Sequence, residues 1–72
     1  MKVLVNNSLY EMGNKEYMGV IKVASAQIPC GIYAVEKGGI CELRKDKFER
    51  KEDLKKTVEE YEDNGFKVYY NL

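Results

Sequence analysis

The segment of about residues 51–64 constrains the fold more than any other part of the sequence. Leu54, Val58 and Tyr61 fall at positions i, i+4 and i+7, which places one apolar stripe along a helix. Asn64-Gly65 follows this stripe, and glycine takes the left-handed conformation that commonly ends a helix. The pattern predicts an amphipathic helix at about residues 51–64 that buries only one of its sides.

The beginning of this helix is less sharply marked than its end. Arg50 would stand at the N-cap, where Ser, Thr, Asp or Asn is preferred. Asp46 and Glu49 have the spacing of a capping box. An extra turn that begins near Lys47 is therefore an alternative start.

A β-hairpin is predicted directly before the helix. Residues 31–36 and 40–44 flank Lys37-Gly38-Gly39, and a Gly-Gly pair readily takes the positive φ angles of a tight turn. Successive side chains of a strand point to opposite faces. The uniformly apolar face is expected to lie beneath the helix and carries Ile32, Ala34, Cys41 and Leu43. The other face carries Tyr33, Val35, Ile40, Glu42 and Arg44.

A further strand is predicted after the helix, where residues 66–72 alternate with a period of two. The face expected to meet the helix carries Phe66, Val68, Tyr70 and Leu72. Lys67, Tyr69 and Asn71 share the opposite face.

The first thirty residues carry weaker signals. Lys2–Val5 predicts a strand that can continue to Tyr10. Within residues 14–28, helical spacing is shown by Tyr17, Ile21, Ala24 and Ile28. The β-branched residues of this stretch favour a strand, and Gly19 and Pro29 disfavour a long helix, so we predict a strand at Tyr17–Ser25. The expected fold is α+β: a small, mostly antiparallel sheet in the order β-β-β-β-α-β, with one helix on one face.

The length and the cysteines limit the kinds of domain and site that this chain can form. Its 72 residues suffice for one compact domain, expected to span residues 1–72, and no apolar run resembles a signal peptide or a membrane span. Cys30 and Cys41 are the only cysteines and there is no histidine, so one chain cannot supply four zinc ligands. The hairpin separates the two thiols by about 13 Å, too far for a disulfide. Two free thiols and a cytoplasmic location are expected.

No pattern in the sequence predicts catalysis. Histidine, the usual acid–base residue near neutral pH, is absent. Cys30 lies at the predicted start of a strand, yet no neighbouring base would activate its thiol. We expect no enzymatic activity, no cofactor and no metal site.

The opposite face of the sheet is expected to need additional cover. A helix of about 13 residues is about 20 Å long and 10 Å wide, so it covers one face only. The other face would present Tyr33, Val35, Ile40 and Tyr69, a contiguous apolar surface. Three arrangements would cover it: the N-terminal strands as a second layer, a second copy of the chain, or another protein.

The leading functional prediction is a non-enzymatic protein-interaction module that binds a host or self partner. The predicted surfaces are this sheet face and the acidic helix end formed by Glu59, Glu60, Glu62 and Asp63. The abundance of Lys, Glu, Ile, Asn and Tyr is typical of AT-rich bacterial genomes and their phages. We therefore expect a phage or mobile-element accessory or inhibitor protein, with a homodimer as one form.

The alternative is a small nucleic-acid-binding accessory protein. Its surface would combine the sheet tyrosines with the basic residues Lys45, Lys47, Arg50 and Lys51. Twelve basic and twelve acidic residues cancel, and ten of the basic residues are lysines. Arginine is preferred for paired contacts to phosphate and guanine, so this alternative is less favoured.

Overall fold

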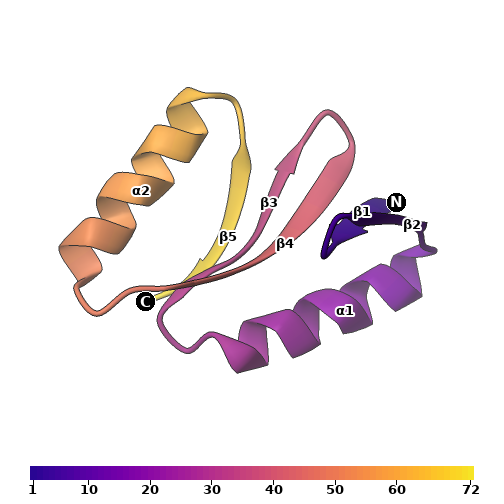
Figure 1. Ribbon diagram of the computed structural model, residues 1–72, viewed down its shortest axis with the longest axis horizontal. Coiled ribbons are helices and arrows are strands. Elements are labelled where there is room, and N and C mark those ends of the chain that lie inside the picture. Colours follow the sequence, from indigo (N-terminus) through magenta and orange to yellow (C-terminus); the bar gives the residue numbers. More distant parts are fainter.

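A computed structural model describes residues 1–72. Its elements are β1 (Lys2–Val5), β2 (Ser8–Glu11), α1 (Asn14–Gln27), β3 (Gly31–Lys37), β4 (Ile40–Lys47), α2 (Lys51–Asp63) and β5 (Lys67–Asn71). The five strands form one sheet in the order β2-β1-β4-β3-β5, in which only β1 and β4 run parallel. Figure 1 shows α2 on one side of the sheet and α1 on the other. The predicted α+β class is confirmed, whereas the predicted element order is wrong.

The N-terminal third accounts for the difference in order. Tyr17–Ser25, predicted as a strand, lies within helix α1, whose C-cap is Ile28. A β-branched residue such as Val20 lowers helix stability by only about 0.5 kcal/mol relative to alanine. Packing against the sheet outweighs this cost, because Ile21 is half-buried and Ile28 is 1% exposed. Pro29 follows the helix end, where proline commonly occurs, and does not interrupt the helix.

The expected continuation of the first strand to Tyr10 is also wrong, because a tight turn divides it. Asn6 and Asn7 have φ angles of 48° and 68°, which suit a two-residue hairpin turn with two left-handed positions. Val5 pairs with Ser8 across this turn. Asparagine is among the residues that adopt positive φ most readily, so the Asn-Asn pair explains why β1 and β2 form a hairpin.

The helix predicted at residues 51–64 is confirmed as α2, Lys51–Asp63. Its end has the predicted geometry, since Gly65 has a φ of 83° and the amide of Phe66 donates to the carbonyl of Tyr61 at 3.0 Å. The rings of Tyr61 and Phe66 then meet edge to face, with centroids 5.4 Å apart. This is the hydrophobic contact expected of a Schellman ending.

The alternative start near Lys47 is wrong, because β4 extends to that residue. The carboxylate of Asp46 accepts a hydrogen bond from Arg44 within the strand, so it caps no helix. Arg50 is the N-cap and makes no side-chain capping hydrogen bond.

A β-bulge at Tyr33 changes which side chains share a face. Against β5, the pairing of β3 shifts between Ile32 and Ala34 and leaves Tyr33 as the extra residue, while against β4 the shift at the same place leaves the extra residue on β4. Ile32 and Val35 therefore both pack against Leu54 and Val58 of α2. The predicted face beneath this helix is wrong, because only Ile32 packs there among Ile32, Ala34, Cys41 and Leu43. Alternation failed as a guide because helices lie on both faces of the hairpin, so that each face carries some apolar residues.

Helix α1 covers the sheet face that was expected to lack cover. Tyr17 of α1 lies against Tyr69 of β5, and Cys41 is fully buried next to it. The N-terminal third thus supplies a second layer, formed by a helix and not by strands. The prediction that a single helix leaves one face of the sheet bare is wrong.

The two helices cover the sheet unequally. Helix α2 packs on β3 and β5, and its Leu54 and Val58 are 0% and 5% exposed. Helix α1 has no buried residue within its bounds, and its Met18 and Val23 are 65% and 60% exposed. We call α2 with β3 and β5 the closed half, and α1 with β1, β2 and β4 the open half.

Candidate interaction groove

A tyrosine pair holds the first turn of α1 against the sheet. The Tyr17 hydroxyl donates to Tyr69 Oη at 3.4 Å, and the Tyr69 hydroxyl donates to Glu36 Oε1 at 3.2 Å. Burial raises the pKa of the Tyr17 hydroxyl, and the hydrogen bond with Tyr69 raises it further. Tyr17 therefore remains a protonated donor at neutral pH. The chain of hydrogen bonds ties α1 to the β3–β5 side of the sheet.

Cys41 lies beneath this contact and is a poor nucleophile. Burial raises the pKa of its thiol, and a hydrogen bond with Tyr17 only partly opposes the effect. The thiolate is the reactive form of cysteine, so a buried thiol with a raised pKa packs as a small apolar group. Cys30 and Cys41 are both free, as expected.

Asn71 holds the other end of α1. Its Nδ2 donates to the carbonyl of Ile28 at 2.9 Å, to the carbonyl of Ser25 at 3.1 Å and to Ser25 Oγ at 3.0 Å. Asn71 belongs to β5, the edge strand that also carries Tyr69. Both ends of α1 are thus attached to β5, and Tyr17 also contacts Cys41 of β4.

This one-sided attachment leaves a groove between α1 and the strands β1 and β4. The groove has a volume of about 770 Å³. Its helix wall is formed by Glu16, Gly19, Val20, Val23, Ala24 and Gln27. Its sheet wall is formed by Val5, Asn6, Leu43, Arg44 and Lys45. Valine, leucine and alanine side chains line its middle, while the ionisable residues Glu16 and Lys45 stand on opposite walls.

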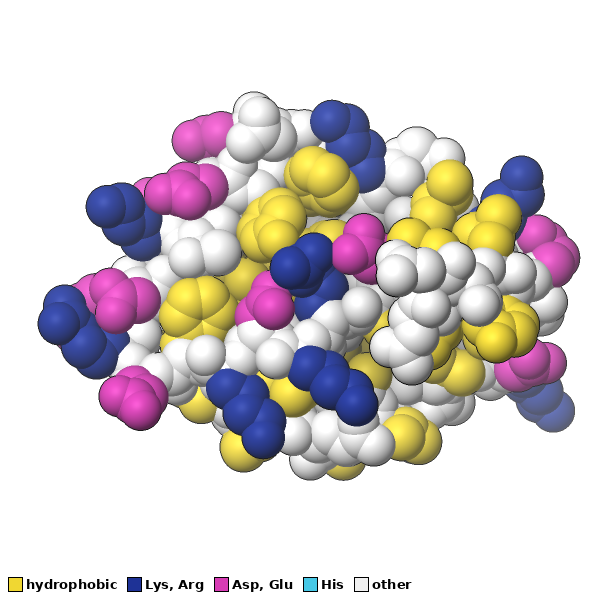
Figure 2. Space-filling model, in the orientation of Figure 1, with side chains coloured by type: hydrophobic (Ala, Val, Ile, Leu, Met, Phe, Trp, Pro, Cys, Tyr) yellow, Lys and Arg dark blue, Asp and Glu magenta, His cyan; other side chains and the backbone are white.

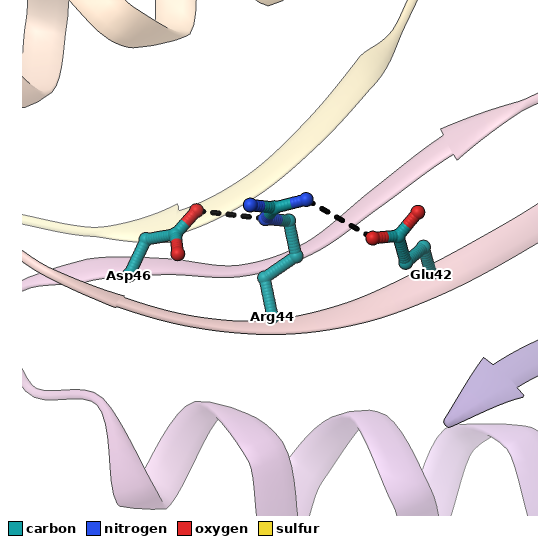
Figure 3. Close-up of polar contacts among 3 residues, drawn as sticks. All are labelled: Glu42, Arg44 and Asp46. Carbon is teal, nitrogen blue, oxygen red and sulfur yellow. Dashed lines mark hydrogen bonds and ion pairs between the residues drawn. The ribbon is translucent and has the colours of Figure 1, made fainter. Parts of the chain in front are cut away.

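Arg44 lines the groove, but its guanidinium lies on the other face of β4 (Figure 3). Its Nε lies 2.7 Å from Asp46 Oδ2, its Nη1 lies 3.0 Å from Glu42 Oε1, and its guanidinium lies 6.0 Å from the ring of Tyr61. Figure 3 shows the three charged side chains on the face of β4 away from α1. The hydrogen bond from Arg44 to Asp46 raises the pKa of the arginine, so the guanidinium stays charged. The middle of the groove therefore remains apolar.

The structure separates the residues of the predicted sheet-face site. Val35 is 2% exposed beneath α2, so it cannot contact a partner. Tyr33 and Tyr69 are half-buried on the α1 side, with ring centroids 6.2 Å apart. Ile40 is 41% exposed and lies beside Lys2 of β1. The four residues do not form one surface, because the bulge and α1 redistribute them.

The acidic helix end is exposed as predicted. Glu59, Glu60, Glu62 and Asp63 are all exposed, and none of them forms an ion pair. Lys37 supplies the positive charge that stabilises this end, since its Nζ donates to the carbonyl of Asn64 at 2.8 Å. The same Nζ lies 4.9 Å from the centre of the Phe66 ring. A role of the acidic residues in binding stays a prediction.

The predicted basic surface is weaker than its sequence indicates. Lys45, Lys47 and Lys51 are exposed, but Arg50 Nε lies 3.5 Å from carboxylate oxygens of both Glu52 and Asp53. Figure 2 shows charged side chains of both signs mixed over one face of the molecule. Binding of nucleic acid through these residues stays a prediction that the geometry does not strengthen.

The sequence carried a signal for the groove that the strand prediction concealed. The groove-lining residues of α1 fall at spacings of three, one, three, one and three, which is one side of a helix. Gly19 stands in the middle of this side, and no atom outside the helix's own backbone lies within 4 Å of the position its Cβ would take. A helix assignment for residues 14–28 would have exposed this second apolar side.

The structure shows no metal site and no membrane-spanning helix, and the chain matches no known protein in the comparisons made. No group of three or more Asp, Glu, Cys or His side chains is placed to hold a metal ion. Neither helix has the length and apolar character needed to cross a bilayer. Comparisons of the chain with protein-family models, curated proteins and solved structures gave no match.

Proposed function

We propose that this chain is a non-enzymatic protein-interaction module and that its partner binds in the groove between α1 and the strands β1 and β4. The observation that carries this proposal is the incomplete burial of α1. Helix α1 has no buried residue, and its Val23 is 60% exposed beside the groove. The rest of the chain therefore leaves one apolar side of α1 uncovered. Apolar surfaces of this kind mark sites of interaction.

The lining of the groove favours a protein partner over a small molecule. A small-molecule site usually surrounds its ligand and orients it with a few convergent polar groups. Here the polar side chains of the lining do not come from one place, since Glu16 and Gln27 belong to the helix wall and Asn6 and Lys45 to the sheet wall. A partner helix with one apolar side and polar ends would match this lining, as in proteins that bind an amphipathic helix in a groove.

Several features support the non-enzymatic assignment and a cytoplasmic site of action. The groove contains no cysteine, and the buried Cys41 thiol is a weak nucleophile. Two free cysteines suit a reducing compartment. Assignment as a phage or mobile-element accessory or inhibitor protein rests on composition alone and belongs to this proposal.

A matched pair of variants on α1 tests the binding surface. Val23→Lys places a charge in the groove, whereas Met18→Lys places the same charge at an exposed position outside it. Tagged wild-type and variant chains are used to capture proteins from a bacterial lysate, with quantification by mass spectrometry. We expect Met18→Lys to retain the wild-type partners and Val23→Lys to lose them. Equal capture by both variants would show that the groove is not the binding surface.

A further inference from the structure

We propose that the partner in the groove is a second copy of this chain, docked through antiparallel contact of the two α1 helices. This inference rests on the proposed function and names the partner of the same groove. A two-fold axis would pass between the α1 helices midway along them. Each copy would then insert its own exposed helix side into the groove of the other.

The helix wall of the groove is self-complementary. A two-fold contact requires each residue of the surface to meet a suitable residue of the same surface. An axis midway between Ile21 and Lys22 places Glu16 opposite Gln27, Gly19 opposite Ala24, and Val20 opposite Val23, as the spacing of the groove residues dictates. The three kinds of contact are a carboxylate with an amide, two small residues, and two valines. The polar contacts fall at the ends and the apolar contacts at the centre.

Gly19 supports close approach of a second helix. Glycine in a helix interior is unfavourable by about 1 kcal/mol relative to alanine. The chain itself gives no reason for this cost, since no atom outside the helix's own backbone lies within 4 Å of the missing Cβ. In the proposed dimer Gly19 lies opposite Ala24, where the helix axes can approach to about 8 Å.

The charges permit this pairing, and the area limits its strength. The chain has no net charge, and each copy brings one Glu16 and one Lys45 to the groove, so two copies do not repel one another. Helix α1 has 14 residues. It is therefore about 21 Å long, and one such helix side is smaller than the roughly 800 Å² per partner of a stable complex. We infer a reversible dimer, with a dissociation constant on the order of 10–100 μM.

Light scattering and sedimentation velocity over a range of concentrations test the dimer. For the wild type and Met18→Lys, we expect the mass to rise with concentration from 8.3 kDa toward twice that value. Val23→Lys is expected to remain monomeric, and Gly19→Leu, which fills the open space at the helix contact, is expected to do the same. A wild-type mass that stays at 8.3 kDa up to about 1 mM, well above this range, or equal dimerisation of Met18→Lys and Val23→Lys, would overturn the inference.

Charge variants at Gln27 test the antiparallel register. Gln27→Lys places a cation opposite Glu16 twice per dimer and is expected to tighten the dimer about threefold at low salt, whereas Gln27→Glu should weaken it about threefold. Shifts of the same sign for both variants would contradict the register.

The proposed function and this inference fail in different ways. A monomeric wild type whose captured partners are lost only in Val23→Lys would refute the dimer and leave the groove as a binding surface for another protein. Dimerisation and capture that are both unchanged in Val23→Lys would refute both proposals.

Discussion

The closed and open halves each contain one helix and share one sheet, yet they differ in how completely the sheet buries the apolar side chains of that helix. Helix α2 has a single apolar stripe, and Leu54 and Val58 of that stripe are buried. Helix α1 has apolar residues on more than one side: Tyr17 meets the sheet, Val23 lines the groove and Met18 points elsewhere. One sheet is enough to bury the apolar side chains of a helix that has a single stripe. A helix with apolar residues on several sides leaves at least one of those sides uncovered.

The largest expected effect comes from truncating one apolar side chain in each helix, fully buried in α2 and half-buried in α1. Leu54→Ala removes a fully buried side chain in the closed half and should lower the free energy of unfolding by about 3 kcal/mol. Val20→Ala removes a half-buried side chain in the open half and should cost less than about 1 kcal/mol. Urea denaturation of both variants gives the comparison. Equal losses would remove the distinction between the halves.

The buried thiol of the open half predicts a pH dependence of stability. An unfolded chain has a cysteine pKa of about 8.5, and burial raises the pKa of Cys41 in the folded chain. Above this pH the unfolded chain releases a proton that the folded chain retains. The free energy of unfolding should therefore be constant below about pH 8.5 and fall above it, by up to about 1.4 kcal/mol per pH unit. Denaturation between about pH 8.5 and 10, below the usual pKa of tyrosine, should show this slope in Cys30→Ala and its loss in Cys41→Ala.

Removal of the Tyr17 hydroxyl should loosen one half only. Tyr17→Phe loses the hydrogen bond to Tyr69 and should cost about 1 kcal/mol. Because this bond holds α1, hydrogen exchange should accelerate in the amides of α1 and stay unchanged in α2. Tyr10→Phe is the control, since Tyr10 is 50% exposed and its hydroxyl makes no hydrogen bond within the chain. Equal acceleration in both helices would mean that the halves open together.

Glycine substitutions should act with opposite signs in the two halves. Gly19→Ala in α1 should stabilise the chain by about 0.5–1 kcal/mol, because the alanine Cβ enters open space. Gly65→Ala should destabilise it by about 1 kcal/mol or more, because Gly65 has a φ of 83° at the end of α2. Thermal denaturation measures both changes. Destabilisation by Gly19→Ala would show that the groove is filled in the isolated chain.

The smallest expected effect is at the charged face of β4. Arg44→Met removes two ion pairs between partly exposed groups. Exposed ion pairs contribute little, so stability should change by about 0.5 kcal/mol or less. A loss above about 2 kcal/mol in urea denaturation, far beyond an exposed pair, would show that this face contributes to the core.

Local signals in the sequence were sufficient to predict α2, its end and the β3–β4 hairpin, although β4 belongs to the open half. The stripe of α2, its Gly65 ending and the β3–β4 hairpin depend on residues near one another in the chain, and these predictions are confirmed. The contact of Phe66 and Val68 with the α2 core is confirmed for the same reason, but the prediction is wrong for Tyr70 and Leu72, which are 41% and 55% exposed. Alternation carries no information about a bulge, so Tyr33 misled the assignment of faces.

The open half depends on contacts between distant residues. The parallel pairing of β1 with β4 and the attachment of α1 to Tyr69 and Asn71 join segments that have no local signal in common. Helical spacing was present in residues 14–28, but β-branched residues concealed it until packing on the sheet decided the outcome. The groove could not be predicted, because it exists only where α1 and β4 come together.

Amide chemical shifts over a dilution series test most directly that the open half is an available binding surface. Spectra of the ¹⁵N-labelled chain are recorded between about 20 μM and 1 mM, a range that spans the expected dissociation constant. We expect concentration-dependent shifts at Gly19, Val23 and Leu43, with the amides of α2 unchanged and the shifts abolished in Val23→Lys. Two results would contradict the account. One is a set of spectra that change neither with concentration nor when a captured partner is added, and the other is a set of shifts centred on α2.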